Sequence, residues 1–180
     1  AFRMASNSDY IKKEIKESFN YDLHVISGEE EAEYAYLGAI SNLHNSEVSM
    51  VIDIGGSSTE IIYGEGFNIL FKNSLQLGSV SGTEQFLKHS PPLKVETENF
   101  RDVIKKMFSA FEKNLFPKKV IAIAGTATTL ACMKMGLKEF EENKADKCII
   151  SIQDMRNIIG ELNSITTTEI LDKFGPVMKG

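Results

Sequence analysis

An acidic residue, two glycines and several hydroxyl groups occur together in the middle of the chain, and together they could bind a phosphate. Asp53 lies near the end of the β-forming run Val48–Ile54. Four small residues come next and form a predicted phosphate-binding loop: Gly55, Gly56, Ser57 and Ser58. Glycine tolerates positive φ, so we expect the amides of both glycines to point into a shared concavity that holds an anion. A carboxylate beside that anion can bind Mg²⁺, which makes Asp53 a candidate metal ligand. The alternative is an ordinary hairpin whose glycines serve geometry alone.

A second candidate anion site follows the apolar run Val120–Ala124. Its continuous apolar character predicts a buried strand. Gly125 and Thr126 then open a predicted helix that ends near Gly136. Free N–H groups at a helix N-terminus bind anions, although a capped helix without a ligand would have the same sequence.

Three consecutive acids, Glu29, Glu30 and Glu31, begin a predicted helix over residues 28–40. Ser27 and Glu30 have the spacing of a capping box, and acids in a first turn suit the helix dipole. This structural role accounts for at least two of the three acids. The functional alternative is that one of them is a general base facing a phosphate.

The elements around these motifs predict an α/β fold. Strands are expected on both sides of the glycine loop, followed by a third antiparallel strand over Phe67–Leu77 and then alternating helices and strands. Two further short strands are expected at Leu23–Ile26 and Cys148–Ile152. This order predicts a mixed sheet flanked by helices, similar to the ribonuclease-H-like half of an actin or sugar-kinase type protein.

Composition limits the classes of partner. The chain has 180 residues and a net charge of −5. This negative net charge gives no electrostatic reason to expect nucleic acid or a membrane surface as a partner. No apolar run has spanning length, and the two cysteines lack metal-site spacing, so we expect a cytoplasmic protein. The three histidines lie in unrelated contexts, which leaves Ser–His catalysis without support.

Four motifs, in order, resemble the exopolyphosphatase/guanosine pentaphosphate phosphohydrolase family. They are Phe2–Asn7, Ile26–Ala32, Val51–Glu60 and Gly125–Ala131. The resemblance implies a fold of the actin/hexokinase/Hsp70 superfamily with an active site between two domains. It also implies Mg²⁺-dependent hydrolysis of the terminal phosphate of polyphosphate or the 5′-γ-phosphate of pppGpp.

The resemblance assigns roles to single residues. Arg3 matches the family's phosphate-binding arginine, and Glu31 its catalytic glutamate, which activates a water. Asp53, Gly55 and Gly56 match the second phosphate loop with its metal-associated acid. Gly125 and Thr126 match the far wall of the cleft. Ser57 departs from the pattern, because the family usually has a third glycine there, and serine fits only if its φ stays negative.

Two other family segments are missing from the sequence: a first phosphate loop upstream and an Arg-Ala-Asp segment downstream. We therefore expect a fragment, with residues 1–30 the tail of a first domain and 31–180 an incomplete second ribonuclease-H-like domain. We expect the fragment alone to be inactive, and a homodimer of the full-length parent stays open. Two other classes also stay open: an ATP-dependent kinase of the same superfamily, and a non-catalytic module that binds polyphosphate or pppGpp.

Overall fold

The computed structural model describes residues 5–41, 47–109, 111, 116–146 and 148–178. The described elements run in this order: α1 (Ser8–Phe19), α2 (Gly28–Ile40), β1 (Val48–Ile54), β2 (Thr59–Glu65), β3 (Asn68–Leu75), α3 (Ser79–Phe86), α4 (Lys94–Phe108), β4 (Lys119–Ile123), α5 (Ala124–Met135), α6 (Glu142–Ala145), α7 (Ile152–Leu162), α8 (Thr167–Phe174) and a 3₁₀ helix (Gly175–Met178). None of the described helices is both long and apolar enough to cross a bilayer.

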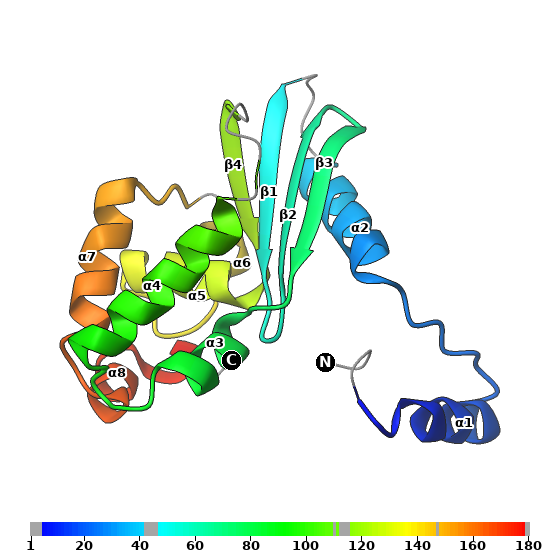
Figure 1. The fold of residues 1–180 in the computed structure, drawn as a ribbon, viewed down its shortest axis with the longest axis horizontal. Coiled ribbons are helices and arrows are strands. Elements are labelled where there is room, and N and C mark those ends of the chain that lie inside the picture. Colours follow the sequence, from blue (N-terminus) through cyan, green and yellow to red (C-terminus); the bar gives the residue numbers. More distant parts are fainter. Residues whose placement is uncertain (1–4, 42–46, 110, 112–115, 147, 179–180) are drawn as a thin grey trace.

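The strands form one mixed sheet in the order β3-β2-β1-β4, which confirms the predicted fold class (Figure 1). β1, β2 and β3 are an antiparallel meander, and β4 pairs with β1 in parallel. Two registers matter for the site. Asp53 lies opposite Glu60 on β2 and opposite Ile123 on β4. The carboxyl ends of β1 and β4 therefore meet at the same edge of the sheet.

Helix α2 covers one face of the sheet and forms the core with it. Tyr36 is fully buried against Val51 of β1 and Ile62 of β2. The Tyr36 hydroxyl donates to the Gly66 carbonyl (2.8 Å), so its polar end is satisfied within the core. An added Cβ at Gly64 would lie 2.4 Å from this hydroxyl. The core therefore fixes α2, and with it the first turn of α2, against the sheet.

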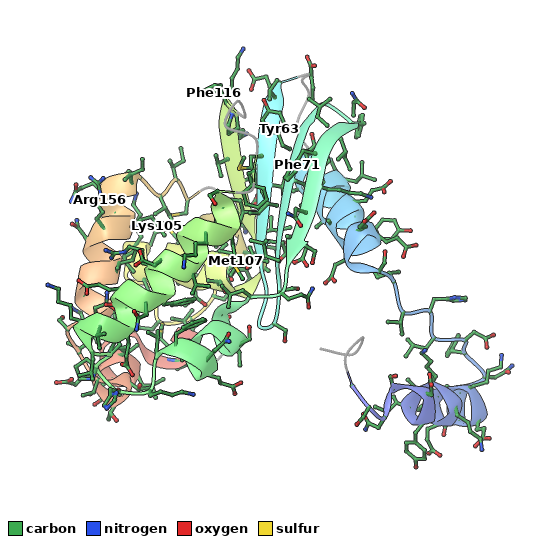
Figure 2. All side chains as sticks on the ribbon, viewed as in Figure 1. Tyr63, Phe71, Lys105, Met107, Phe116 and Arg156 are labelled. Atoms are coloured by element: carbon green, nitrogen blue, oxygen red, sulfur yellow. The ribbon has the colours of Figure 1, made fainter. Side chains whose placement is uncertain are left out.

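Helices α4, α5 and α7 lie on the other side of the sheet (Figure 1). Figure 2 shows Tyr63 and Phe71 on neighbouring strands, where they are a cross-strand pair. The Phe71 ring makes an edge contact with Phe111, which follows α4 (centroids 5.4 Å). Helix α3 is held on α4 by the stacked rings of Phe86 and Phe100 (5.0 Å).

Residues 120–123 form the expected strand as part of β4, but the expectation that it is buried is wrong. β4 is an edge strand of the described sheet; Val120 is 56% exposed and Ala122 is also exposed. The side chains alternate between the two faces, and those of Ile121 and Ile123 lie on the α2 face, where they are half-buried. An apolar run of five residues therefore did not mean burial on both faces.

Two other predicted strands are absent. Residues 23–26 are extended but join no ladder with the described chain, and residues 148–151 precede α7 without strand structure. Helix α1 has no buried residue and lies apart from the sheet (Figure 1). Neither segment finds a strand partner in the described chain, and a strand needs one to satisfy its backbone groups.

Candidate functional site

The glycine loop joins β1 to β2, as the sequence predicts. The Gly55 N–H donates to the Ser58 carbonyl (3.0 Å), which closes the turn. The carbonyls of the two glycines point to the N-terminus of α3. Gly55 O accepts from Ser79 N (2.9 Å), and Gly56 O accepts from Val80 N (2.9 Å) and from Ser81 N (3.0 Å).

The expected positive φ at Gly55 and Gly56 is wrong. In the described chain positive φ occurs elsewhere, at Asn20, Gly66, Ala124, Gly136 and Gly175. In a trans peptide the N–H points opposite to the C=O of the preceding residue. Because the carbonyls of Gly55 and Gly56 both point to α3, the N–H groups of Gly56 and Ser57 both point away from it. Both residues are exposed, so two parallel donors face solvent without a left-handed residue.

Asp53 and Glu60 place two carboxylates side by side on the α2 face of the sheet. They are directly opposite each other in the β1–β2 ladder. Burial raises the pKa of Asp53 above its usual value, and the negative charges of Glu60 and Glu31 raise it further. Glu60 is only 2% exposed and accepts a hydrogen bond from the Ser74 hydroxyl on β3 (2.7 Å).

The three glutamates in the first turn of α2 have different surroundings. The Glu30 carboxylate accepts from the Ser27 N–H (2.8 Å) and the Ser27 hydroxyl accepts from the Glu30 N–H (3.1 Å), which confirms the capping box. Hydrogen bonds from Ser27 hold the pKa of Glu30 below its usual value. Glu29 lies 3.6 Å from the ammonium of Lys72. Glu31 is half-buried, and its charge acts on Asp53, so it is the glutamate that faces the acidic end of the sheet.

Helix α5 begins directly at the end of β4, beside the glycine loop. The Thr126 hydroxyl donates to the Ile54 carbonyl (2.9 Å) and ties this helix to the end of β1. That hydroxyl proton is already used, so Thr126 can offer an anion its main-chain N–H. Ala124 has φ +69°, a left-handed conformation that is unusual for a residue with a Cβ. Strained backbone of this kind often occurs at functional sites.

An open hollow of about 370 Å³ lies between the first turn of α2 and β3. Ser27, Glu29, Lys72 and Ser74 are among the residues that line it. Since Ser74 holds Glu60, the hollow borders the acidic end of the sheet. Its lining includes neither Asp53 nor Glu60 nor any residue of the loop 55–58, so it neighbours the candidate site without containing it.

Within the described residues, no three acidic, histidine or cysteine side chains are close enough to form a metal site by themselves. Mg²⁺ usually takes one or two carboxylates from the protein and further ligands from water and phosphate oxygens. Asp53 meets that smaller requirement. A cation beside it would also relieve the repulsion from Glu60 and Glu31, which adds to burial in raising the pKa of Asp53.

The structure brings most of the predicted site residues to one edge of the sheet. They are Glu31, Asp53, Gly55, Gly56, Ser57, Ser58, Gly125 and Thr126. Arg3 lies outside the described residues. Sequence reasoning missed Glu60 and Ser74. For Glu60 a signal existed: it is directly followed by the apolar run 61–63 in the same strand, and a four-residue loop places it opposite Asp53.

Several known proteins are similar to this chain. A model of the Ppx/GppA phosphatase family matches residues 1–173. The guanosine-5′-triphosphate,3′-diphosphate pyrophosphatase of Pseudoalteromonas translucida is 38% identical over 103 residues, which are 57% of this chain and 20% of that protein. The protein of the same name from Aliivibrio fischeri is 34% identical over 129 residues, 72% of this chain and 22% of that protein. The alignments thus span about a fifth of the length of these curated relatives.

Solved structures share the fold over almost the whole chain. The Aquifex aeolicus PPX-GPPA enzyme superposes with a TM-score of 0.87 at 28% identity, over 97% of this chain and 57% of that one. An exopolyphosphatase from Cytophaga hutchinsonii gives 0.75 at 26% identity, over 98% of this chain and 58% of that one. The family model covers all but the last seven residues and the fold agrees with it, so the chain belongs to the Ppx/GppA phosphatase family.

Proposed function

We propose that this chain is part of a phosphohydrolase that removes the terminal phosphate of inorganic polyphosphate or the 5′-γ-phosphate of pppGpp. Relatives named for each activity support the two substrates. The observation that carries the proposal is the convergence at one edge of the sheet. Parallel main-chain donors, an α-helix N-terminus, the half-buried Asp53 and the buried Glu60 meet there. Together they can supply the positioning and charge stabilisation on which phosphoryl transfer depends.

The main chain binds the phosphate in this proposal. The N–H groups of Gly56 and Ser57 point together into solvent and donate to phosphoryl oxygens. Gly125 and Thr126 add the N–H groups of the first turn of α5, where the helix dipole also favours an anion. The Ser58 hydroxyl adds a short donor at the base of the loop. Donors held in place before the reaction need no reorganisation when charge develops on the phosphate.

Glu31 is the general base. It is positioned by α2, whose capping box occupies Glu30 and whose core packing involves Tyr36. Its carboxylate takes a proton from the attacking water and orients that water toward the terminal phosphorus. The resemblance also assigns Arg3 to the phosphate, where its guanidinium would neutralise charge.

Asp53 would hold Mg²⁺ together with phosphate oxygens. When bound, the ion would neutralise negative charge on the phosphates. Glu60 sets the charge around this ligand, because its buried carboxylate lies opposite Asp53 and is held by Ser74. Without a cation, burial and then the charges of Glu60 and Glu31 raise the pKa of Asp53.

The domain boundary stays a proposal as well. We place residues 1–30 in a first domain and 31–180 in the second. The separation of α1 and residues 20–27 from the sheet supports a division just before α2, which begins at Gly28, about three residues ahead of the proposed boundary (Figure 1). The shares of the solved structures that this chain covers, 57% and 58%, are consistent with a longer protein.

The test compares phosphate release by two proteins, the 180-residue chain and the full-length protein that contains it. Substrates are polyphosphate, pppGpp and ATP with a sugar or acetate acceptor, each with and without Mg²⁺. We expect Mg²⁺-dependent release of phosphate by the full-length protein and none by residues 1–180. Phosphoryl transfer to an acceptor would indicate a kinase instead, and tight binding without turnover would indicate a sensing module.

A further inference from the structure

Gly78, just before α3, touches the glycine loop more closely than any side chain could. A Cβ added at Gly78 would lie 2.4 Å from Gly55 O, 2.5 Å from Gly56 C and 2.6 Å from Gly56 O. All three are main-chain atoms, which cannot move aside as a flexible side chain can. The φ of Gly78 is −123°, so glycine is required there by contact and not by backbone conformation.

The close approach lets α3 bind the loop through its first turn. The first N–H groups of a helix have no partner inside the helix. In α3 they are taken by the loop, because the N–H groups of Ser79, Val80 and Ser81 donate to the carbonyls of Gly55 and Gly56. These bonds fix the planes of two consecutive peptides.

Both ends of this contact are anchored. The Thr59 hydroxyl donates to the Leu77 carbonyl (2.7 Å), which ties the start of β2 to the residue before Gly78. The Gly78 N–H donates to the Ser81 hydroxyl (2.9 Å). Further along α3, Gly82 packs against the Phe100 ring of α4. The loop is therefore connected through α3 to the helical side of the protein.

We propose that the first turn of α3 is a clamp that aims the phosphate-binding N–H groups of Gly56 and Ser57, and that Gly78 is the positioning residue that allows it. The inference rests on the proposed function, in which those N–H groups bind the terminal phosphate. The clamp holds the carbonyls on one side of the two peptides, and a trans peptide then directs the N–H groups to the other side. Pulling Gly78 away from the loop would release both peptides.

The main experiment compares Gly78→Ala with Gly82→Ala in the full-length protein. Both changes add one methyl beside α3, and the Gly82 methyl would meet Phe100 Cζ at 2.6 Å without touching the loop. Three quantities are measured: the melting temperature, hydrogen exchange of the segment 54–58, and kcat and KM for phosphate release from tripolyphosphate. Binding of tripolyphosphate is followed by calorimetry.

We expect both variants to melt earlier, but only Gly78→Ala to speed exchange in 54–58 and weaken tripolyphosphate binding. Its kcat/KM should fall about tenfold to a hundredfold, as expected for donors displaced by an ångström. Equal exchange and equal kinetics in the two variants would overturn the proposal. If the wild-type protein binds tripolyphosphate but releases no phosphate, the proposed function fails. The hydrogen-exchange and binding measurements on the two variants still test whether α3 positions the loop.

A second pair of variants, which disturbs the packing less, tests the proposal if Gly78→Ala does not fold. Ser81→Ala removes the hydroxyl that accepts from Gly78 N–H, and Thr83→Ala removes a hydroxyl that donates to Ser79 O within α3. The clamp predicts faster exchange in 54–58 and weaker binding for Ser81→Ala alone. Identical behaviour of these two variants would contradict it.

Discussion

The two sides of the candidate site supply different kinds of chemistry. On the acidic side, the roles proposed for Glu31, Asp53, Glu60 and Ser74 belong to side chains on α2 and the sheet. On the amide side, the donors proposed in the loop 55–58 and at the start of α5, residues 124–126, are main-chain N–H groups. The first side depends on which residues are present. The second depends on what holds the backbone.

This difference predicts how each side responds to substitution. A side chain on the acidic side can be replaced by a near-isostere that removes charge and keeps shape. The amide side has no such variant, because its donors belong to the main chain and change only when a neighbour moves them. Activity should therefore be most sensitive to charge on one side and to steric contact on the other.

The largest effect is expected for Glu31→Gln in the full-length protein. The amide keeps the shape and loses the base, so phosphate release should fall by about 10²–10⁴-fold. Binding of tripolyphosphate, measured by calorimetry, should stay close to wild type because the amide side is intact. The matched control is Glu30→Gln, whose amide can still accept in the capping box. A reversal, with Glu30→Gln inactive and Glu31→Gln active, would show that the base is assigned to the wrong glutamate.

Asp53→Asn should change activity and stability in opposite directions. Burial and the charges of Glu60 and Glu31 raise the pKa of Asp53 in the folded protein. The unfolded chain binds this proton less tightly than the folded protein does, so ionisation of Asp53 lowers the free energy of unfolding. This destabilisation is complete above the raised pKa of Asp53. It disappears below about pH 3.8, the usual pKa of the group. Asn removes this repulsion. At pH 7 the variant should therefore melt at a higher temperature but have lost most Mg²⁺-dependent activity.

The pH dependence provides the check for Asp53. The gain in melting temperature of Asp53→Asn over wild type should shrink as the pH falls through the raised pKa of Asp53, because wild-type Asp53 then becomes neutral too. A constant gain between pH 7 and pH 4, followed by circular dichroism, would show that the carboxylate repulsion is not its cause.

The acidic side was predicted only in part from the sequence, which named Glu31 and Asp53 but neither Glu60 nor Ser74. The S-x-x-E spacing of Ser27 and Glu30 identified the capping box, which left Glu29 and Glu31, and the family resemblance chose Glu31 between them. The hairpin register could have been used further, since it also places Glu60 opposite Asp53. Ser74 could not be found this way, because its role depends on where β3 pairs with β2.

The amide side could be located but its geometry could not be predicted. The glycine loop and the start of α5 are where the sequence indicated, but positive φ occurs at Ala124 and not at the glycines of either turn. Residues far from the turn determine this outcome, since α3 binds the loop carbonyls. The prediction that β4 is buried was wrong for a similar reason: an apolar run does not show whether a strand lies at the edge of the sheet.

Gly125→Ala tests whether the start of α5 really contacts phosphate. Among the described residues, a methyl at Gly125 would meet nothing within 4 Å beyond its chain neighbours and the backbone of its own helix, and its φ is not positive. Alanine in a helix is favoured over glycine by about 0.5–1 kcal/mol, so the variant should be as stable as wild type or slightly more. If phosphate approaches this turn, the methyl occupies its space and the KM for tripolyphosphate should rise. Unchanged kinetics in the stable variant would exclude close contact with phosphate at Gly125.

The smallest effect is expected for Ala124→Gly, in the same turn. Ala124 has φ +69°, which costs a residue with a Cβ about 1–2 kcal/mol. Glycine removes this strain but adds about 0.4–1 kcal/mol of unfolded-state entropy, so the two terms nearly cancel. We therefore expect a melting temperature equal to or slightly above that of wild type and unchanged kinetics, because the N–H groups of Gly125 and Thr126 keep their positions. The Thr126 hydroxyl, bound to Ile54 O, holds the turn in place in either variant. If activity falls although stability is kept, the Ala124 side chain itself helps to direct the α5 donors, and the amide side depends on a side chain after all.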